Sequence, residues 1–337
     1  MFTMKKADLQ KLLERFAGLK IGVIGDFALD CYWRMNPETA LPSIETGKPT
    51  RPVEQQRYAA GAAGNVAMNL VALGCAQVTA FGVIGQDPWG RELLHTLKKS
   101  RIDTTGLIQQ EQDWATVTYV KPIIGGIEEN RIDFGDFNLL HDSTANNLLQ
   151  QLRRALPALD AIVINAQARA GIHSTMLRKG LQQIIENNPD KIFTVDSREP
   201  EAMYAGSVLK INNLELTKAC GLRPEYNEIG AWEPLRHALS ALYVARQQTV
   251  FVTCGAQGIM VCDKDGITNV PAIKWEGETD TTGAGDAVMA AITTTLAAGA
   301  TPVQAAFTGN LAAAVCIKKL NQTGSASPAE MLQNLQA

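Results

Sequence analysis

The segment 280–286, with the sequence Asp-Thr-Thr-Gly-Ala-Gly-Asp, places two acids around two glycines just before an apolar stretch. The glycines allow a tight backbone turn in which neighbouring N–H groups point toward one place. The residues that follow, 287–292, are almost entirely apolar and predict a buried helix. Because N–H groups at the start of a helix attract anions, the segment predicts a phosphate site.

Asp286 is expected in the first turn of this helix, beside the anion site. A carboxylate there can accept a proton from a hydroxyl nucleophile while the N–H groups of Thr282, Gly283, Ala284 and Gly285 hold the oxygens of a transferring phosphate. The alternative is an ordinary Gly-rich loop in which Asp286 only complements the helix dipole. The second acid and the buried helix favour the catalytic interpretation.

The elements that must position this segment follow from the hydrophobic pattern. Short runs rich in Val and Ile predict strands buried on both faces, at 20–25, 78–85, 161–165, 192–196, 208–212 and 250–254. Apolar residues at helical spacing predict intervening helices at 65–73, 89–100, 144–156, 175–187 and 232–246. This alternation indicates the α/β class, a three-layer α/β/α sandwich with a mostly parallel central sheet. Such sheets bind ligands beyond the carboxyl ends of their strands.

Two stretches interrupt the alternation of strands and helices. Residues 30–58 are long, polar and rich in proline, and 115–134 have short alternating strands around the turn signal Gly125-Gly126. Both are expected to form a small β-sheet lid over the site. Because no change in composition marks a linker, we expect a single domain over 1–337 with lid segments at about 30–58 and 115–134.

Composition excludes several classes of protein. A chain of 337 residues with 46% hydrophobic residues predicts a folded protein, and a net charge of −3 argues against a nucleic-acid partner. No apolar run is long enough for a membrane span, and the first twenty residues do not resemble a signal peptide. The six scattered cysteines predict reduced thiols, so we expect a cytoplasmic protein.

The segment 280–286 resembles the C-terminal signature of the ribokinase-like PfkB family of carbohydrate kinases, which ends in the catalytic base. Further segments resemble other family elements in the family's order. These are 25–30 (first strand and loop), 60–67 (N-terminal signature), 212–215 (the N-x-x-E element) and 253–258 (the T-x-G-x-x-G turn). The similarity runs from about residue 20 to 328. Five elements in the correct order identify a PfkB-type kinase.

The resemblance implies specific roles for individual residues. Asp286 would be the catalytic base, and the substrate-binding residues would be Asp26, Asp30, Gly61, Asn65 and, from the lid, Arg131. The nucleotide-binding residues would be Asn212, Glu215, Thr253, Gly255, Gly258 and, near the adenine, Asn310. The implied cofactors are ATP and Mg²⁺, with Glu215 holding the metal through water. Dependence on a monovalent cation is left open.

Several of these residues have ordinary structural interpretations that stay open. Asn65 can cap the helix that begins near Gly64, and Asp26 can cap a turn. Glu215 can be an exposed acid at a helix start, and Arg131 can be a solvated arginine at a strand edge.

Within the family, residues 25–42 and 131–134 look most like the heptose 7-phosphate kinases. Where those kinases carry D-Y-x-K-G, this chain has 165–171, in which Arg169 could supply a cation. The primary hypothesis is a kinase for a sugar or sugar phosphate. A nucleoside or ribose kinase and a non-catalytic sensor of a sugar or nucleotide stay as alternatives, although Asp286 speaks against the sensor. A lid edge also allows a homodimer.

Overall fold

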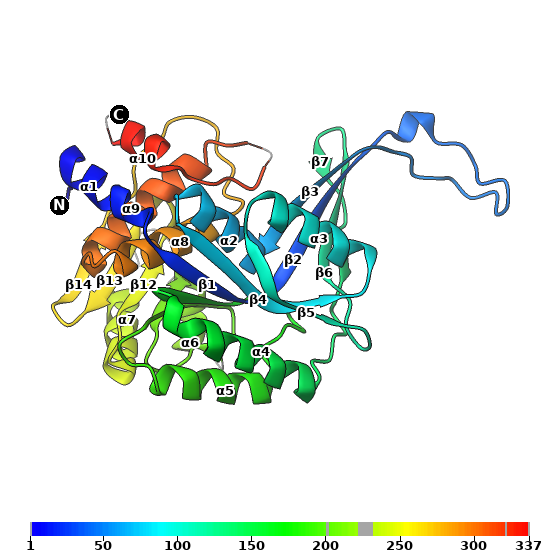
Figure 1. Cartoon of the computed structure of the whole chain (residues 1–337). Coiled ribbons are helices and arrows are strands. Elements are labelled where there is room, and N and C mark those ends of the chain that lie inside the picture. Colours follow the sequence, from blue (N-terminus) through cyan, green and yellow to red (C-terminus); the bar gives the residue numbers. More distant parts are fainter. Residues whose placement is uncertain (1, 200–201, 222–231, 321, 336–337) are drawn as a thin grey trace.

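The computed structural model describes residues 2–199, 202–221, 232–320 and 322–335 and contains two β-sheets (Figure 1). The large sheet has nine strands in the order β14-β13-β12-β11-β10-β9-β1-β4-β5. The strands from β5 through β12 in this order run parallel, and β13 and β14 add an antiparallel edge. Their bounds are β1 (Lys20–Gly25), β4 (Gln77–Gly85), β5 (Asp103–Gln110), β9 (Ala161–Ala166), β10 (Ile192–Ser197), β11 (Val208–Asn212), β12 (Val250–Thr253), β13 (Ile259–Asp263) and β14 (Gly266–Val270).

Helices cover both faces of this sheet, with a hydrophobic core on each side. One face carries α1 (Lys6–Phe16), α2 (Ala63–Ala72), α3 (Pro88–Lys99), α8 (Ala284–Ala297), α9 (Pro302–Cys316) and α10 (Pro328–Asn334). The other face carries α4 (Asp142–Ala155), α5 (Thr175–Glu186), α6 (Asn213–Ala219) and α7 (Trp232–Arg246) (Figure 1). The predicted three-layer α/β/α sandwich is therefore confirmed, as are all the strands and helices predicted above.

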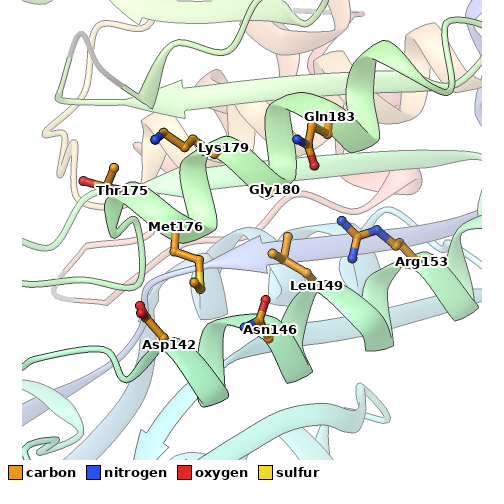
Figure 2. Close-up of a pocket in the computed structure, with 9 residues that line it drawn as sticks. All are labelled: Asp142, Asn146, Leu149, Arg153, Thr175, Met176, Lys179, Gly180 and Gln183. Carbon is orange, nitrogen blue, oxygen red and sulfur yellow. The ribbon is translucent and has the colours of Figure 1, made fainter.

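Helices α4 and α5 pack closely on the second face because α5 contains a glycine. A Cβ atom on Gly180 would lie 2.2 Å from Cδ1 of Leu149 in α4. The two helices line the sides of a surface groove of about 460 Å³ (Figure 2). This groove lies across the sheet from α8, so it is separate from the segment with the predicted chemistry.

The second sheet is built from both segments that were expected to leave the main body. It contains β2 (Phe27–Met35), β3 (Val53–Ala62), β6 (Val117–Ile124), β7 (Ile127–Glu128) and β8 (Ile132–Phe134). Strand β2 pairs with β3 on one side and with β6 on the other, which buries its first residues. The expected small β-sheet is therefore confirmed, and the two ends of the segment 30–58 belong to its strands. Only 36–52 lies outside these strands, as an arm that projects from the body (Figure 1).

Within the described residues, none of the helices combines the length and the apolar character that crossing a bilayer requires.

Candidate active site

Polar residues form a row across the otherwise apolar large sheet, near the carboxyl ends of three adjacent strands. Asn165 of β9 is in register with Asp196 of β10, which is in register with Lys210 of β11. All three are buried. The preceding Thr194 hydroxyl hydrogen bonds Thr293 of α8, so alternate residues of β10, including Asp196, face the α8 side. The row therefore lies under the amino-terminal end of α8.

Asp286 occupies the first turn of α8, as predicted. The helix starts after Gly283, whose φ of 78° is in the left-handed region. The Asp286 Oδ2 atom accepts a hydrogen bond of 2.6 Å from Nδ2 of Asn65 in α2. Asn65 is almost fully buried, and Nδ2 of Asn69, one turn later, donates to the Asn65 Oδ1 atom at 3.2 Å. Two helices distant in sequence thus fix the position of this carboxylate.

The surroundings of Asp286 change its acidity. Burial raises its pKa to about 6 from the ordinary value of 3.8, and the negative charge of Asp196 acts in the same direction. Hydrogen bonds from Asn65 and Gln167 and the positive charge of Lys210 act to lower it. A carboxyl group with a pKa near 6 is better suited to accept a proton near neutral pH than an ordinary aspartate.

Lys210 and Asp196 form a buried ion pair beside this carboxylate. Their Nζ and Oδ2 atoms are 2.8 Å apart, and both side chains are more than nine-tenths buried. Burial acts to lower the pKa of Lys210, but Asp196 overcomes this and the pKa is raised, which keeps the lysine charged. Lys210 Nζ lies 3.5 Å from the position that a Cβ on Gly285 would occupy. A positive charge therefore lies directly beside the predicted anion site.

Lys210, Asp196 and Gln167 belong to this group but were not predicted from the sequence. The signal was present, because a lysine at the centre of the apolar strand 208–212 needs a buried partner. The side chain of Gln167 donates to Asp196 Oδ2 at 3.3 Å and also hydrogen bonds Asp286.

The N–H groups of the predicted anion site are not equivalent. The N–H of Thr282 donates to Oδ1 of Asp280 at 2.9 Å, and the N–H of Ala284 donates to the Thr281 carbonyl at 3.2 Å. Within the described structure, Gly283 and Gly285 make no such hydrogen bond, as is usual for N–H groups at the start of a helix. Gly283 and Gly285 therefore present the N–H groups, while Thr282 and Ala284 shape the loop.

Asp26 holds the loop that follows β9. Its Oδ2 atom accepts hydrogen bonds of 2.9 Å from the N–H groups of Gln167 and Ala168, and its Oδ1 atom accepts one of 2.8 Å from Ile172. A Cβ on Gly171 would lie 2.1 Å from Oδ1, so the loop wraps tightly around this carboxylate. Three N–H donors compensate the charge of Asp26, which supports its interpretation as a cap.

Asp30 lies within β2 rather than in a loop after a strand. Its Oδ1 atom is 2.9 Å from Nζ of Lys121 in β6, a residue that the sequence analysis did not select. The neighbouring strand β3 carries Gly61, and a Cβ there would lie 2.9 Å from Asp30 Oδ2. The glycine therefore leaves space beside the carboxylate.

Arg131 lies between β7 and β8 of the second sheet. Its guanidinium makes two hydrogen bonds to Asp133, of 2.6 and 2.7 Å, and lies 4.4 Å from the centre of the Tyr119 ring. Asp30 also contributes to a raised pKa of Arg131, after the larger contribution of its hydrogen bond to Asp133. Arg131 is thus a half-exposed arginine with a carboxylate partner of its own.

Asn212 and Glu215 form a reciprocal cap at the start of α6. The Asn212 Oδ1 atom accepts from the Glu215 N–H at 2.8 Å, and the Glu215 Oε2 atom accepts from the Asn212 N–H at 2.7 Å. Burial raises the pKa of Glu215, while the N–H bond and Lys210 act to lower it. Glu215 is half-buried near Lys210 and is not an exposed acid at a helix start.

The residues expected beside the nucleotide mostly shape turns. Gly255 and Gly258 both have positive φ, and a Cβ on Gly258 would lie 2.2 Å from the Val270 carbonyl oxygen. The Thr253 hydroxyl donates weakly, at 3.5 Å, to the Ile211 carbonyl. Asn310 is buried and donates from Nδ2 to the carbonyls of Val270 and Pro271. These contacts fix the backbone at the end of β14.

The structure brings one group of site residues together by direct contacts. Asp286, Asn65 and Gln167 are connected by hydrogen bonds, and the pair Asp196–Lys210 adjoins them. Asn212 follows Lys210 on β11, and its cap partner Glu215 lies in the first turn of α6. The second sheet holds a separate group around Asp30, which includes Lys121 and Gly61. Among the described residues, no hydrogen bond or ion pair links Thr253, Gly255, Gly258 or Asn310 to Asp286.

The chain is similar in sequence to curated proteins. It is 30% identical over 313 residues to the "Bifunctional protein HldE" of Coxiella burnetii, covering 89% of this chain and 60% of that protein. It is 28% identical over 308 residues to the protein of the same name from Helicobacter acinonychis, covering 89% and 63%. The chain therefore spans about three-fifths of the length of these relatives.

Solved structures share the fold. Phosphofructokinase-2 from Escherichia coli in complex with potassium superposes with a TM-score of 0.72 at 19% identity, covering 94% of this chain and 98% of that chain. Arabidopsis thaliana ribokinase complexed with ribose and ATP gives a TM-score of 0.70 at 16% identity, covering 95% and 99%. These matches establish a ribokinase-like fold.

The model of the pfkB family of carbohydrate kinases matches residues 23–329, a range that contains every selected site residue. The structure adds the family's mostly parallel sheet and its second small sheet. The chain therefore belongs to the pfkB family of carbohydrate kinases.

Proposed function

We propose that this protein transfers the γ-phosphoryl group of ATP to a hydroxyl group of a sugar or sugar phosphate. One observation supports this proposal most strongly. The carboxylate of Asp286, with its raised pKa, lies in the first turn of α8 beside the N–H groups of Gly283 and Gly285 and the charge of Lys210. A proton acceptor next to an anion site is what phosphoryl transfer to an alcohol requires.

Asp286 acts as the general base in this proposal. It orients the acceptor hydroxyl and takes its proton as the oxygen bonds to phosphorus. Asn65 holds Oδ2 in place, and Oδ1 is the oxygen that faces the acceptor. Gln167 and Asn65 also stabilise the ionised form by hydrogen bonds.

The γ-phosphoryl oxygens lie at the start of α8. The N–H groups of Gly283 and Gly285 and the positive end of the helix compensate charge as the bond to ADP breaks. Lys210 adds a full positive charge that its ion pair with Asp196 holds in place. This anion hole has fewer N–H donors than the sequence predicted. Thr282 and Ala284 use their N–H groups for hydrogen bonds within the loop.

Glu215 is the residue that we propose to hold Mg²⁺. Glu215 uses Oε2 for the cap of α6, which leaves Oε1 to hold the metal through water, and the Asn212 cap fixes its direction. Bound Mg²⁺ would neutralise phosphate charge and orient the oxygens for in-line transfer. Thr253, Gly255, Gly258 and Asn310 shape the turns that would contact the rest of the nucleotide. Monovalent-cation dependence is tested by comparing turnover in potassium and sodium.

The second sheet acts as a lid in this proposal, and the whole chain forms one kinase domain. Asp30 binds sugar hydroxyls, assisted by Lys121 and by the space that Gly61 leaves. Asp26 and Arg131 contribute indirectly, because each already has partners of its own. Binding of the sugar should protect backbone amides of 115–134 from hydrogen exchange, and unchanged exchange would contradict the lid role.

The lid also supports a proposal of a homodimer. Ile44 of the arm and Ile127 of β7 are exposed apolar residues, at 103% and 71% of their full accessibility. Burying them against a second copy would remove apolar surface from water. Sedimentation of the protein and of the double variant Ile44→Asp/Ile127→Asp tests this, since the variant should be monomeric.

The free cysteines support a cytoplasmic location for this enzyme.

The decisive experiment measures ADP release from Mg-ATP over a panel of free sugars, sugar phosphates and nucleosides. The Asp286→Asn protein serves as the blank. Turnover of one sugar or sugar phosphate, absent in the blank, is the expected result. Turnover of a nucleoside or ribose would favour the first alternative. Binding of ATP and a sugar with no turnover would favour the sensor.

A further inference from the structure

A second pocket lies beside the loop that Asp26 holds, and the proposed reaction leaves its two arginines unused. The pocket has a volume of about 340 Å³ and is formed by the loops after β9 and β10 and the segment before α4. Arg169, an exposed residue of the loop after β9, and Arg178, in the first turn of α5, both line it. We propose that this pocket binds a phosphate monoester group through Arg169 and Arg178.

The charges around the pocket favour an anion. Among the described residues, neither Arg169 nor Arg178 has an ion pair or a hydrogen bond to another side chain. Asp26 lines the pocket but is already compensated by three N–H donors. Glu199 also lines it, is exposed, and pairs with neither arginine. Two guanidinium groups are therefore free to bind the same ligand.

The walls of the pocket are fixed before any ligand binds. Nε2 of His173 donates to the Asn165 carbonyl, and its Nδ1 accepts from the Tyr204 hydroxyl at 2.7 Å. Burial lowers the pKa of this histidine, and the nearby charge of Arg178 also acts to lower it. His173 is thus neutral, and the positive charge of the pocket comes from the arginines. Arg178 itself is half-buried, which limits its rotamers.

Backbone groups add suitable donors. The N–H groups of Arg169, Ala170 and Gly171 take no part in the hydrogen bonds that fix this loop among the described residues. The amino-terminal end of α5, capped by Ser174, also lines the pocket. Guanidinium forks combined with backbone N–H groups match the oxygens of a phosphate monoester.

The pocket adjoins the proposed reaction centre through one short loop. Gln167 contacts Asp286, and Arg169 follows two residues later. Two peptide steps place their Cα atoms at most about 7.6 Å apart, which is comparable to the length of a sugar. The phosphate can therefore belong to the acceptor itself or to a separate phosphorylated effector. The acceptor case rests on the proposed kinase function, whereas phosphate binding does not.

Calorimetric titration with inorganic phosphate tests the site. The full chain carrying Asp286→Asn is used in saturating Mg-ATP, so that the proposed nucleotide site is filled and cannot turn over. Arg169→Ala and Arg178→Ala should each weaken phosphate binding about tenfold or more, since charge-assisted hydrogen bonds contribute about 1.5–3 kcal/mol. Arg178→Lys should bind with intermediate affinity and also covers the case in which the alanine variant fails to fold.

The matched control removes one positive charge from a different place. Arg153 lines the groove between α4 and α5, where Lys179 is the other cation (Figure 2). Arg153→Ala should leave phosphate affinity unchanged. Absence of phosphate binding, or equal affinity in the Arg178 variants and the parent, would overturn the proposal. Loss of affinity in Arg153→Ala equal to that in Arg178→Ala would also overturn it, because it would indicate general charge attraction.

Inhibition kinetics with the wild-type protein then distinguish the two sources of the phosphate. Inorganic phosphate that competes with the acceptor identifies the site as that of the acceptor's own phosphate. Arginine-dependent phosphate binding without competition identifies a separate effector. If the sugar panel shows no turnover but the arginines still bind phosphate, the proposed function fails and the phosphate site stands.

Discussion

Asn65 and Asp286 are 221 residues apart in the chain, and their side chains share a hydrogen bond of 2.6 Å. Asn65 does not cap its helix: the N-cap position of α2 is Ala62, and the Asn65 amide turns toward α8 instead. The bond joins the segment 60–67 to the segment 280–286. It fixes the Oδ2 oxygen of Asp286, a carboxyl group that Gln167 also contacts.

Replacement of Asp286 by asparagine tests its role as a base. Asp286→Asn keeps the size of the side chain and an oxygen that can accept from Asn65, but it cannot take a proton. We expect the turnover rate to fall about 100-fold or more with ATP affinity nearly unchanged. Asp265→Asn, in the exposed turn between β13 and β14, is the matched control and should retain full activity. Equal rates for the Asp286 variant and the parent would exclude the role.

The pH dependence follows from the raised pKa of Asp286. A general base must be ionised, so kcat/KM should fall as pH decreases through about 6 and level off above it. Removing Asn65 removes a hydrogen bond that favours the ionised form, so Asn65→Ala should move this transition to higher pH. A pH profile of the two proteins over pH 5–9 checks both statements. An unshifted transition in the variant would mean that another group is being titrated.

The raised pKa of Asp286 also predicts how the stability of the protein changes with pH. Stability should decrease as pH rises, whereas an acid whose pKa is lowered by a salt bridge has the opposite effect. The native pKa lies above the ordinary 3.8, so the native protein binds more protons than the unfolded chain between about pH 4 and 6. Ionisation of Asp286 therefore destabilises the protein as pH rises through this interval. Asp286→Asn should unfold at a higher temperature than the parent at pH 8, and the difference should vanish near pH 4. A constant difference at all pH values would contradict this linkage.

The sequence predicted the layers of the fold because the parallel strands are continuous apolar runs. It did not predict β5, whose residues Asp103–Gln110 are mainly polar and half-buried at the edge of the sheet. It predicted that 30–58 belongs to a small β-sheet but not where the strands lie, since β2 is stabilised by pairing with β3 and with the distant strand β6. Such pairing leaves no local pattern.

Site residues were predictable where a motif carries them, and less so where the fold brings them together. Asp286 and its glycines stand in one segment, so their chemistry is visible in the sequence. Lys210, Asp196 and Lys121 lie singly within strands, and only the registers of the sheets give them a partner. Their role depends on how far they are buried and on which residues they pair with. Neither property can be predicted from composition or from spacing along the chain.

The ion pair Lys210–Asp196 contributes both to stability and to the charge beside the anion site. A double-mutant cycle can measure its contribution to the free energy of unfolding. Lys210→Met leaves a buried carboxylate without its cation and should lower the free energy of unfolding by about 3–5 kcal/mol. Asp196→Asn combined with Lys210→Met should recover much of this loss, because no charge stays unpaired. The double variant should nevertheless have low turnover, since the positive charge beside Gly285 is gone. Additive losses in denaturant unfolding would show that the two groups do not interact.

Gly283 is a position where a side chain should affect both the backbone conformation and catalysis. Its φ of 78° disfavours any side chain by about 1–2 kcal/mol, and a Cβ would lie 2.8 Å from Nδ2 of Asn65. Gly283→Ala should therefore displace the amide that holds Asp286 and lower turnover by an order of magnitude or more. Gly74 has a φ of 89°, and a Cβ there would meet no atom within 4 Å, which makes Gly74→Ala the control for the backbone cost alone. Both variants should lose stability in thermal unfolding, Gly283→Ala more than Gly74→Ala because of its close contacts, but only Gly283→Ala should lose activity. Equal turnover in the two variants would mean that the contact between α2 and the turn before α8 does not position the base.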